Sequence, residues 1–462
     1  MNKYQGKRCF IVATGPSLAY KNMSFLEDEF TIGVNLSPIM FDLWGFQPDF
    51  NIVADKYVFP YYKKELLKLI KDTNTIKIAV ASACDTYPEE LKDKNTFFVP
   101  KKLPQDIVSF STNPVQQGFS RGKTVTYDAV QLANFLGFNE VYILGMDMST
   151  NHEWGVNGHC YELQQNPKFS ELNFFGTDSH VIQRGLPGNS NYREFIETLM
   201  AYARTIFEEQ GKRLFIEESS QLKSLPKINI FKDFANMPNV VAVVPAKGTS
   251  SRVPSKNIKL LGDKPLYLHI VDTLLSCATI DNVYLDTESE KVKTLLGDRQ
   301  VYWIKRDPKL ASNATDGNTL LLYEASQITD TDIIVQALPT GPFLSRKSID
   351  DTVYSLIIDR TLESAFTILK SKNYTWNNNG TPNYDIDKIP NSVDLQPTII
   401  EAMNLYAIRK ETLLSLKRRI GNKFHMQEIS EIEATDIDTP EDFMIAEAIY
   451  QKINERQKYE KR

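Results

Sequence analysis

The sequence predicts an α/β protein built from two doubly wound, Rossmann-like domains. Residues 8–15 (RCFIVATG) and 239–248 (NVVAVVPAKG) are runs of apolar and β-branched residues that break at a glycine, as buried parallel strands do before a loop. Strand-like and helix-like patterns then alternate, for example the helical residues 126–137 and the strand-like residues 140–148. This alternation indicates parallel sheets covered by helices.

Each of these two segments looks like the first strand of a sheet, and two such strands in a chain of 462 residues indicate two domains. Residues 225–239 carry two prolines around a short irregular piece, so we expect domains at 1–235 and 236–462. The last residues, 440–462, predict an amphipathic helix with a charged end.

The composition excludes several classes of protein. The 53 Lys and Arg residues against 58 Asp and Glu give a net charge of −5, which argues against a protein that mainly binds nucleic acid. The 4 cysteines form no CxxC pair, so neither a zinc ribbon nor a disulfide framework is predicted, and a cytoplasmic location is expected. No apolar run approaches the roughly 18 residues of a membrane span, which leaves at most peripheral membrane association.

The first candidate site is a loop within residues 243–266, directly after the second of the two strands. It combines small, hydroxyl-bearing and cationic residues, and Pro254 prevents it from being helical throughout. Backbone amides and cations in such a loop can surround a triphosphate while charge develops on the leaving pyrophosphate. The alternative is a basic surface loop without function. The candidate residues are Lys247, Gly248, Thr249, Ser250, Ser251, Arg252, Lys256, Asn257 and Lys259.

The second candidate site is a pair of carboxylates in residues 435–440 (TDIDTP). Asp436 and Asp438 are two residues apart, so their side chains share a face if this segment is strand-like. Two such carboxylates favour a hard cation such as Mg²⁺. The alternative is helix capping, because Asp438 or Thr439 could cap the helix that follows.

Residues 243–266 resemble the N-terminal signature of the CMP-sugar synthetases, above all the CMP-sialic acid (acylneuraminate) cytidylyltransferases. Residues 306–321, 335–350 and 433–447 are similar, in the same order, to three further segments of that family. The resemblance implies a nucleotide-diphospho-sugar (GT-A-like) fold and a homodimer. It also implies that an acidic sugar, sialic or another nonulosonic acid, attacks the α-phosphorus of CTP with Mg²⁺ present and that pyrophosphate leaves.

This resemblance also implies roles for individual residues. Lys247 and Arg252 would hold the triphosphate, Lys256 and Asn257 would complete the loop, and Gln336 would read the cytosine edge. The sequence departs from the family in places: Lys247 stands where the family has an arginine with a bidentate fork, and Asn313 replaces an acid. Residues 403–406 blur a family turn, and no arginine for a sugar carboxylate is evident there. The departures concern the sugar more than the nucleotide.

In the N-terminal half, residues 10–20 (FIVATGPSLAY) predict a strand, a turn and the start of a helix. Backbone amides at such a helix start favour an anion, so Gly15, Pro16 and Ser17 are the predicted phosphate turn. Asn35 follows the second predicted strand, and Asp55 and Asp147 are acids at strand ends. The alternative is a purely structural turn.

Together with residues 32–37, 46–59 and 122–149, this start resembles flagellin-type glycosyltransferases, hydroxymethylpterin pyrophosphokinase-like proteins and the small bacterial sialyltransferases. The likeness to the sialyltransferases implies a histidine base, for which His180 is the first candidate and His159 the second. It also implies that Tyr161 or Tyr192 lies near the departing phosphate. No HxxxH pattern occurs among the histidines, which argues against zinc.

We therefore expect a bifunctional enzyme of bacterial surface glycan synthesis. The C-terminal domain would make a CMP-sugar, and the N-terminal domain would transfer the sugar to a glycan or protein acceptor. Their fusion would raise the local concentration of the CMP-sugar intermediate. In two alternatives, the N-terminal domain is pyrophosphokinase-like, or it is a non-catalytic nucleotide-binding module.

Overall fold

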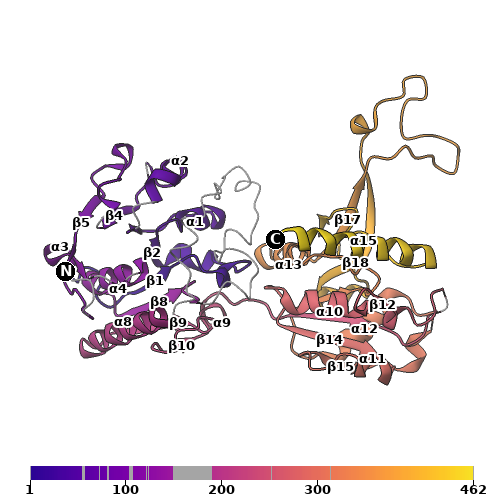
Figure 1. Cartoon of the computed structure of the whole chain (residues 1–462), viewed down its shortest axis with the longest axis horizontal. Coiled ribbons are helices and arrows are strands. Elements are labelled where there is room, and N and C mark those ends of the chain that lie inside the picture. Colours follow the sequence, from indigo (N-terminus) through magenta and orange to yellow (C-terminus); the bar gives the residue numbers. More distant parts are fainter. Residues whose placement is uncertain are drawn as a thin grey trace. The chain divides into compact units, whose positions relative to one another are not determined.

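The computed structural model describes residues 2–54, 58–71, 73–80, 83–102, 108–120, 122, 124–148, 190–250, 252–312 and 314–460. The chain divides into two compact units, Met1–Met237 and Pro238–Arg462, each with its own large sheet (Figure 1). The boundary expected after residue 235 lies two residues before this division. The stretch around it is more regular than expected, because β10 (Lys227–Ile228) and α9 (Ile230–Phe234) occupy it.

The first unit is built on an eight-stranded sheet in which every pair of neighbouring strands is parallel. The strand order is β10-β9-β8-β1-β2-β3-β4-β5. The seven strands beside β10 are β9 (Arg213–Glu217), β8 (Glu140–Leu144), β1 (Arg8–Val12), β2 (Phe30–Val34), β3 (Phe50–Val53), β4 (Ile76–Val80) and β5 (Thr96–Val99). From β1 the chain continues to β2 on one side and later returns to β8 on the other, so the topological switch point lies between β1 and β8.

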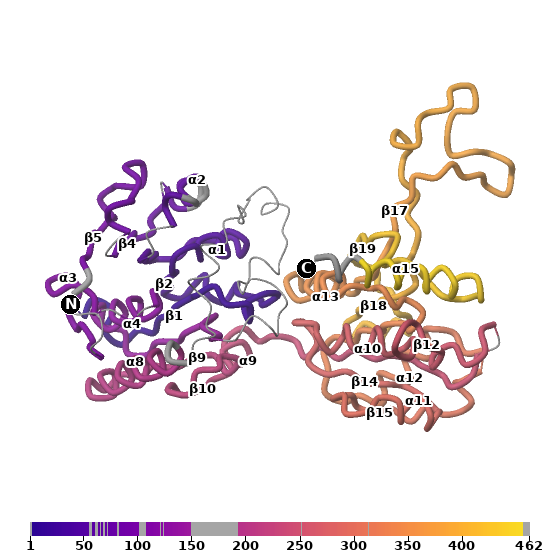
Figure 2. The backbone as a smooth tube through the Cα atoms, viewed as in Figure 1, coloured from indigo at the N-terminus to yellow at the C-terminus, as the bar shows by residue number. Residues whose placement is uncertain are grey.

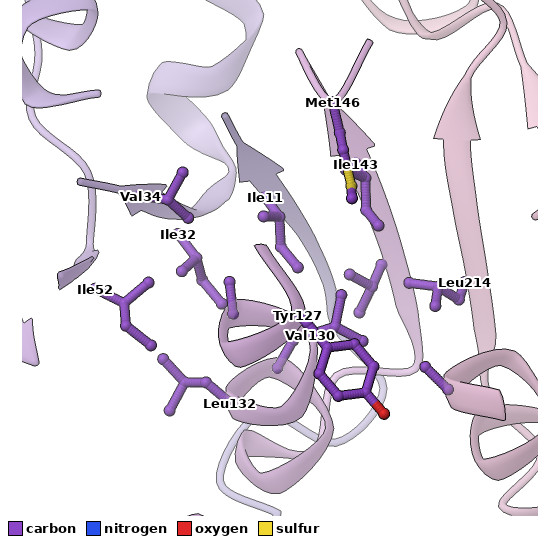
Figure 3. Close-up of a cluster of buried hydrophobic side chains, with 14 of the residues drawn as sticks. Ile11, Ile32, Val34, Ile52, Tyr127, Val130, Leu132, Ile143, Met146 and Leu214 are labelled. Atoms are coloured by element: carbon purple, nitrogen blue, oxygen red, sulfur yellow. The ribbon is translucent and has the colours of Figure 1, made fainter. Parts of the chain in front are cut away.

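Helices cover both faces of this sheet. On one face, α4 (Val125–Leu136) packs its Tyr127 and Val130 against Ile11, Ile32 and neighbouring strand residues (Figure 3). On the other face, Phe10 of β1 and Tyr142 of β8 meet Phe234 of α9, and Phe215 of β9 stacks on Tyr142. The further elements are α1 (Pro38–Trp44), α2 (Val58–Ile70), α3 (Pro114–Gln117), α8 (Ser190–Glu209), β6 (Lys101–Lys102), β7 (Phe119–Ser120) and three 3₁₀ turns, η1 (Pro16–Leu18), η2 (Ser24–Asp28) and η4 (Glu89–Leu91).

The second unit has a seven-stranded mixed sheet in the order β15-β14-β11-β16-β18-β17-β19. Its strands are β15 (Tyr302–Lys305), β14 (Asn282–Thr287), β11 (Val240–Pro245), β16 (Ile333–Ala337), β18 (Thr398–Arg409), β17 (Ser364–Ser371) and β19 (Phe424–Glu428). β18 runs antiparallel to both β16 and β17, and the other pairs are parallel. The α/β class predicted for both halves is confirmed, with this antiparallel strand as the difference from a fully parallel sheet.

The core of this unit lies between the sheet and two helices, α12 (Gly317–Gln327) and α14 (Lys410–Leu416). A smaller cluster joins α15 (Pro440–Glu460) to the start of α10 (Leu266–Ser276) through Ile437, which is fully buried. The remaining elements are α11 (Glu290–Thr294), α13 (Arg346–Ile358), β12 (Leu260–Leu261), β13 (Lys264–Pro265) and the 3₁₀ turns η5 (Lys256–Ile258), η6 (Pro308–Ala311) and η7 (Ser392–Asp394).

Residues 372–397, between β17 and β18, form an arm that extends away from the sheet of the second unit (Figure 2). The arm is ordered by its own polar contacts, such as the bond from Tyr374 Oη to Pro390 O at 2.7 Å. Leu395 near its end is buried, but several other apolar side chains of the arm are exposed: Trp376 is 55%, Ile389 65% and Val393 69% accessible. Within the described part of the chain, no helix is long and apolar enough to cross a membrane.

Candidate functional site

The candidate nucleotide loop begins where β11 ends at Pro245. Gly248 N donates a hydrogen bond to Glu288 Oε1 at 2.7 Å, which fixes the loop against the segment after β14. A Cβ atom on Gly248 would lie 2.6 Å from Ser289 Cβ, so this close approach requires glycine. The chain then reaches Ser255, whose φ of 54° is left-handed, and enters η5.

The loop contacts the segment that carries Asp436 and Asp438, although the two are about 180 residues apart in the sequence. Lys256 is 8% exposed, and its Nζ donates to Ile437 O at 2.6 Å and to Asp438 Oδ1 at 3.2 Å. Asn257 Nδ2 donates to Lys247 O at 2.8 Å, inside the loop. The structure therefore brings Lys256, one of the predicted cations, to Asp438, one of the predicted metal ligands.

The segment that carries Asp436 and Asp438 is not a strand, contrary to the expectation, because its backbone joins no sheet. Ile437 between them is buried against α10 and α15, which leaves both aspartates on the side away from that cluster. The capping role falls to Thr439, since its Oγ1 accepts from Asp442 N at 3.2 Å while Thr439 N donates to Asp442 Oδ2 at 2.7 Å. Asp438 uses its carboxylate differently: Oδ2 accepts from Arg252 Nη1 at 2.7 Å.

Asp436 provides the clearest sign that this place could bind a cation. Its Oδ1 is buried, and within the described residues it has no hydrogen-bond partner. Burial, with the charge of Asp438 adding to it, raises the pKa of the Asp436 carboxyl above its ordinary value. No group of three or more acidic, histidine or cysteine side chains that could hold a metal occurs among the described residues. Two carboxylates nevertheless fit Mg²⁺ that is shared with a triphosphate, because this ion usually keeps waters and phosphate oxygens as its other ligands.

Gln336 lies at the carboxyl end of β16 but faces the core. It is 1% exposed, and its Nε2 donates to Glu324 Oε2 of α12 at 2.7 Å. Nearby, Arg306 and Asp286 form a buried ion pair of 2.6 Å. Burial, with the Asp286 carboxylate adding to it, raises the pKa of Glu324 well above its ordinary value, so protonated Glu324 can donate to Asp286. The amide of Gln336 is thus part of a buried network, and a role in reading cytosine would require it to turn.

Two further residues position the carboxylate segment and were missed from the sequence. Asn404 is fully buried; its Nδ2 donates to Glu433 O at 2.9 Å, and its backbone O accepts from Leu338 N at 2.9 Å. Glu433 in turn accepts from Ser348 Oγ at 2.6 Å and from Ser345 N at 3.1 Å. Asn404 could have been noticed in the sequence, because it is a polar residue within the otherwise mostly apolar pattern of β18.

Arg419 was also missed. Its guanidinium carbon lies 3.7 Å from the ring centre of Tyr406, and its backbone N donates to Asn318 Oδ1 at 2.9 Å. Tyr406 pairs with Gln336 across β18 and β16, and Gln336 pairs with Val243 of β11. At about 4.8 Å per strand, the backbone of Tyr406 is therefore about 10 Å across the sheet from β11, the strand that carries the nucleotide loop, and Arg419 lies over the Tyr406 ring.

In the first unit, the turn predicted to bind phosphate is already occupied by the protein. Gly15 N donates to Gly145 O at 2.8 Å, and Ser17 N donates to Asp147 Oδ2 at 2.8 Å. Ser17 Oγ also donates to Asp147 Oδ1 at 2.5 Å, and Pro16 has no N–H to offer. A phosphate at Gly15, Pro16 and Ser17 would have to displace the Asp147 carboxylate, so the structure as it stands argues for the structural alternative.

Asn35 lies at the end of β2 with a left-handed φ of 47°, and its N donates to Ile52 O at 2.9 Å. Asn51 Oδ1 and Ser37 Oγ nearby are buried and have no partner among the described residues. The remaining candidates cannot be placed: Ser251, Asp55, His159, Tyr161, His180 and Asn313, as well as the side chain of Tyr192, lie outside the described residues.

The second unit is an α/β unit in which the loop after β11 contacts a segment that carries two carboxylates. Residues 241–452 match the family model of cytidylyltransferases. Residues 1–153 match the model of 6-hydroxymethylpterin diphosphokinase MptE-like proteins. The resemblances stated from the sequence are therefore confirmed for the cytidylyltransferases in the second unit and for the pyrophosphokinase-like proteins in the first.

Individual curated relatives match between a quarter and about half of the chain. The chain is 23% identical over 218 residues to N-acylneuraminate cytidylyltransferase of Streptococcus agalactiae serotype III, covering 44% of this chain and 51% of the relative. It is 23% identical over 249 residues to N-acylneuraminate cytidylyltransferase A of Danio rerio, covering 52% and 56%. It is 30% identical over 122 residues to CMP-N,N'-diacetyllegionaminic acid synthase of Legionella pneumophila, covering 25% and 51%. The chain thus spans about half the length of the curated relatives it matches.

Proposed function

We propose that the second unit transfers CMP from CTP to an acidic sugar, sialic or another nonulosonic acid, and releases pyrophosphate. The observation that carries this proposal is the contact of Arg252 and Lys256, from the loop after β11 and its continuation, with Asp438, because cations suited to a triphosphate then lie beside a carboxylate suited to Mg²⁺. The cytidylyltransferase model covers these residues, and relatives named for acylneuraminate and legionaminic acid support the class of sugar.

The residues of the site suggest a division of labour. Lys247 and Arg252 would bind the triphosphate, while the amides around Gly248 and Ser250 would approach its oxygens. Lys256, which is already used by Ile437 and Asp438, would hold the two sides of the site together. Asp436 and Asp438 would hold Mg²⁺, which when bound supplies charge neutralisation for the departing pyrophosphate.

Arg419 supports the acidic character of the proposed acceptor. A sugar bound over β16 and β18 would place its reacting oxygen toward the nucleotide loop and its carboxylate toward this guanidinium. Arginine forms strong, charge-assisted bonds with a carboxylate, and the Tyr406 ring beneath it keeps the guanidinium in place. Glu401 Oε1 forms a long ion pair of 3.8 Å with Arg419 Nη2, which a sugar carboxylate would have to share or replace.

We also propose that the second unit forms a homodimer through the arm at residues 372–397. Single exposed apolar side chains are common on monomers, but Trp376, Ile389 and Val393 lie on one projecting segment, and each is more than half exposed. Sedimentation of the full chain should show a dimer for the wild type and a monomer for Trp376→Glu combined with Ile389→Glu. A dimer that survives both substitutions would rule out the arm.

For the first unit, we propose transfer of the sugar from the CMP-sugar to a glycan or protein acceptor. The MptE-like match favours a second candidate, transfer of diphosphate from a nucleoside triphosphate. A sugar transferase releases CMP when acceptor is present, whereas a diphosphokinase releases a nucleoside monophosphate from a triphosphate without any CMP-sugar.

The central experiment is a pyrophosphate-release assay on the full chain with CTP, Mg²⁺ and a panel of acidic sugars that includes N-acetylneuraminate. Neutral hexoses serve as control acceptors. We expect release only with CTP and an acidic sugar. Release with none of the acidic sugars, from folded protein, would refute the cytidylyl transfer.

A further inference from the structure

Asp438, one of the two carboxylates proposed to hold Mg²⁺, already has two cationic partners. Arg252 Nη1 is 2.7 Å from its Oδ2, and Lys256 Nζ is 3.2 Å from its Oδ1. Together with Asp436, the four side chains carry two negative and two positive charges. A divalent ion that arrives without a nucleotide is therefore not attracted by the net charge of these four side chains.

The two cations are held very differently. The Lys256 side chain is 10% exposed, and its second bond to Ile437 O at 2.6 Å fixes it to the protein. The Arg252 side chain is 62% exposed. Among the described residues, its side-chain contact is the ion pair with Asp438. Exposed pairs of this kind are worth at most about 1 kcal/mol, so the Arg252 contact can be exchanged at little cost.

We propose that Arg252 occupies the metal position in the nucleotide-free protein and leaves it when a triphosphate attracts the guanidinium, so that Mg²⁺ binds together with CTP and not before it. This inference rests on the proposed function, because it takes Asp436 and Asp438 as the metal ligands. A triphosphate can accept two parallel bonds from a guanidinium, whereas Asp438 accepts one. Once Asp438 is released, its oxygen and the unpartnered Asp436 Oδ1 are both available to the ion.

The test measures binding of Mn²⁺ alone to the full chain without nucleotide, by the electron paramagnetic resonance signal of the free ion. Removing one positive charge within about 5 Å of the ion should tighten binding by at least about fivefold in Arg252→Met. Arg252→Lys keeps the charge and should stay close to the wild type. Lys259→Met is the matched control, because Lys259 Nζ lies 3.7 Å from the ring centre of Phe443 rather than on Asp438.

Adding Asp438→Asn to Arg252→Met should remove the gain. Equal Mn²⁺ affinity of the wild type and Arg252→Met would overturn the proposal, and so would a gain that survives Asp438→Asn, since the ion would then bind elsewhere. Circular dichroism confirms that each variant is folded. Pyrophosphate release by the wild type is measured separately. If Arg252→Met binds Mn²⁺ more tightly but the wild type releases no pyrophosphate, only the cytidylyl transfer is refuted. If the wild type is active but Arg252→Met binds Mn²⁺ no more tightly, only the proposed displacement of Arg252 is refuted.

Discussion

Glu217 is a buried acid whose titration should be visible in the stability of the first unit. It ends β9, is 4% exposed, and its Oε2 accepts from Ile230 N at 2.8 Å. Burial raises the pKa of its carboxyl from 4.5 to about 7, and the charge of Glu218 adds to the rise. Because the folded state holds the proton more tightly than the unfolded state, this group stabilises the fold below pH 4.5, and the contribution is lost as the pH rises to about 7.

Glu217→Gln removes this titration but keeps an oxygen that can accept from Ile230 N. At about 1.4 kcal/mol per pH unit, the raised pKa corresponds to at most about 3.5 kcal/mol in the free energy of unfolding. We expect the variant to exceed the wild type by up to that amount near pH 8 and the difference to shrink toward pH 4.5. Native-state hydrogen exchange of β9 and α9 in the full chain reports on this unit separately. A difference that is the same at both ends of the pH range would refute burial of the charge as the cause.

Three further predictions concern the second unit. Asp438→Asn should reduce Mg²⁺-dependent pyrophosphate release below about a tenth of the wild-type rate in a folded protein, because an amide is a poor ligand for a hard cation; a higher rate would count against the metal assignment. Lys256→Met should lower the free energy of unfolding of the second unit by about 1–3 kcal/mol, because it leaves Ile437 O without its donor. Urea unfolding of the full chain measures this, and an unchanged transition of the second unit would show that the bond is unimportant. Gly248→Ala should raise the KM for CTP with little effect on Tm, because the new Cβ would force the loop away from Ser289; an unchanged KM would show that the loop does not contact the nucleotide.

The sequence predicts the sheets well because parallel strands are buried on both faces and appear as uninterrupted apolar runs, as in β1 and β11. The loop after β11 and the carboxylates near the C-terminus were also predictable, since each is a local pattern of residue types. Their contact depends on the tertiary structure, because Lys256 and Ile437 are 181 residues apart and no sequence spacing predicts that they meet.

Other features were out of reach for a different reason. A turn of the GPS type offers amides to any acceptor, and only the fold reveals that Asp147 of the neighbouring strand end accepts from Ser17. Gln336 has the same polar side chain whether it faces a ligand or Glu324, so its direction depends on the packing of α12. Arg419 lies outside every family segment recognised, and its position over Tyr406 depends on the chain after α14 returning to Asn318.

The long sequence separation between Lys256 and Ile437 also bears on how the protein is made. At ribosomal rates of about 5–20 residues per second, the first unit is complete many seconds before the carboxylate segment leaves the ribosome. β18, which pairs with both β16 and β17, and β19, which pairs with β17, come near the end of the chain, so the second sheet cannot close on a nascent chain that stops before them. A truncated translation product would therefore carry a finished first unit and an unfinished second sheet, with the edge of β16 that pairs with β18 left open to chaperones.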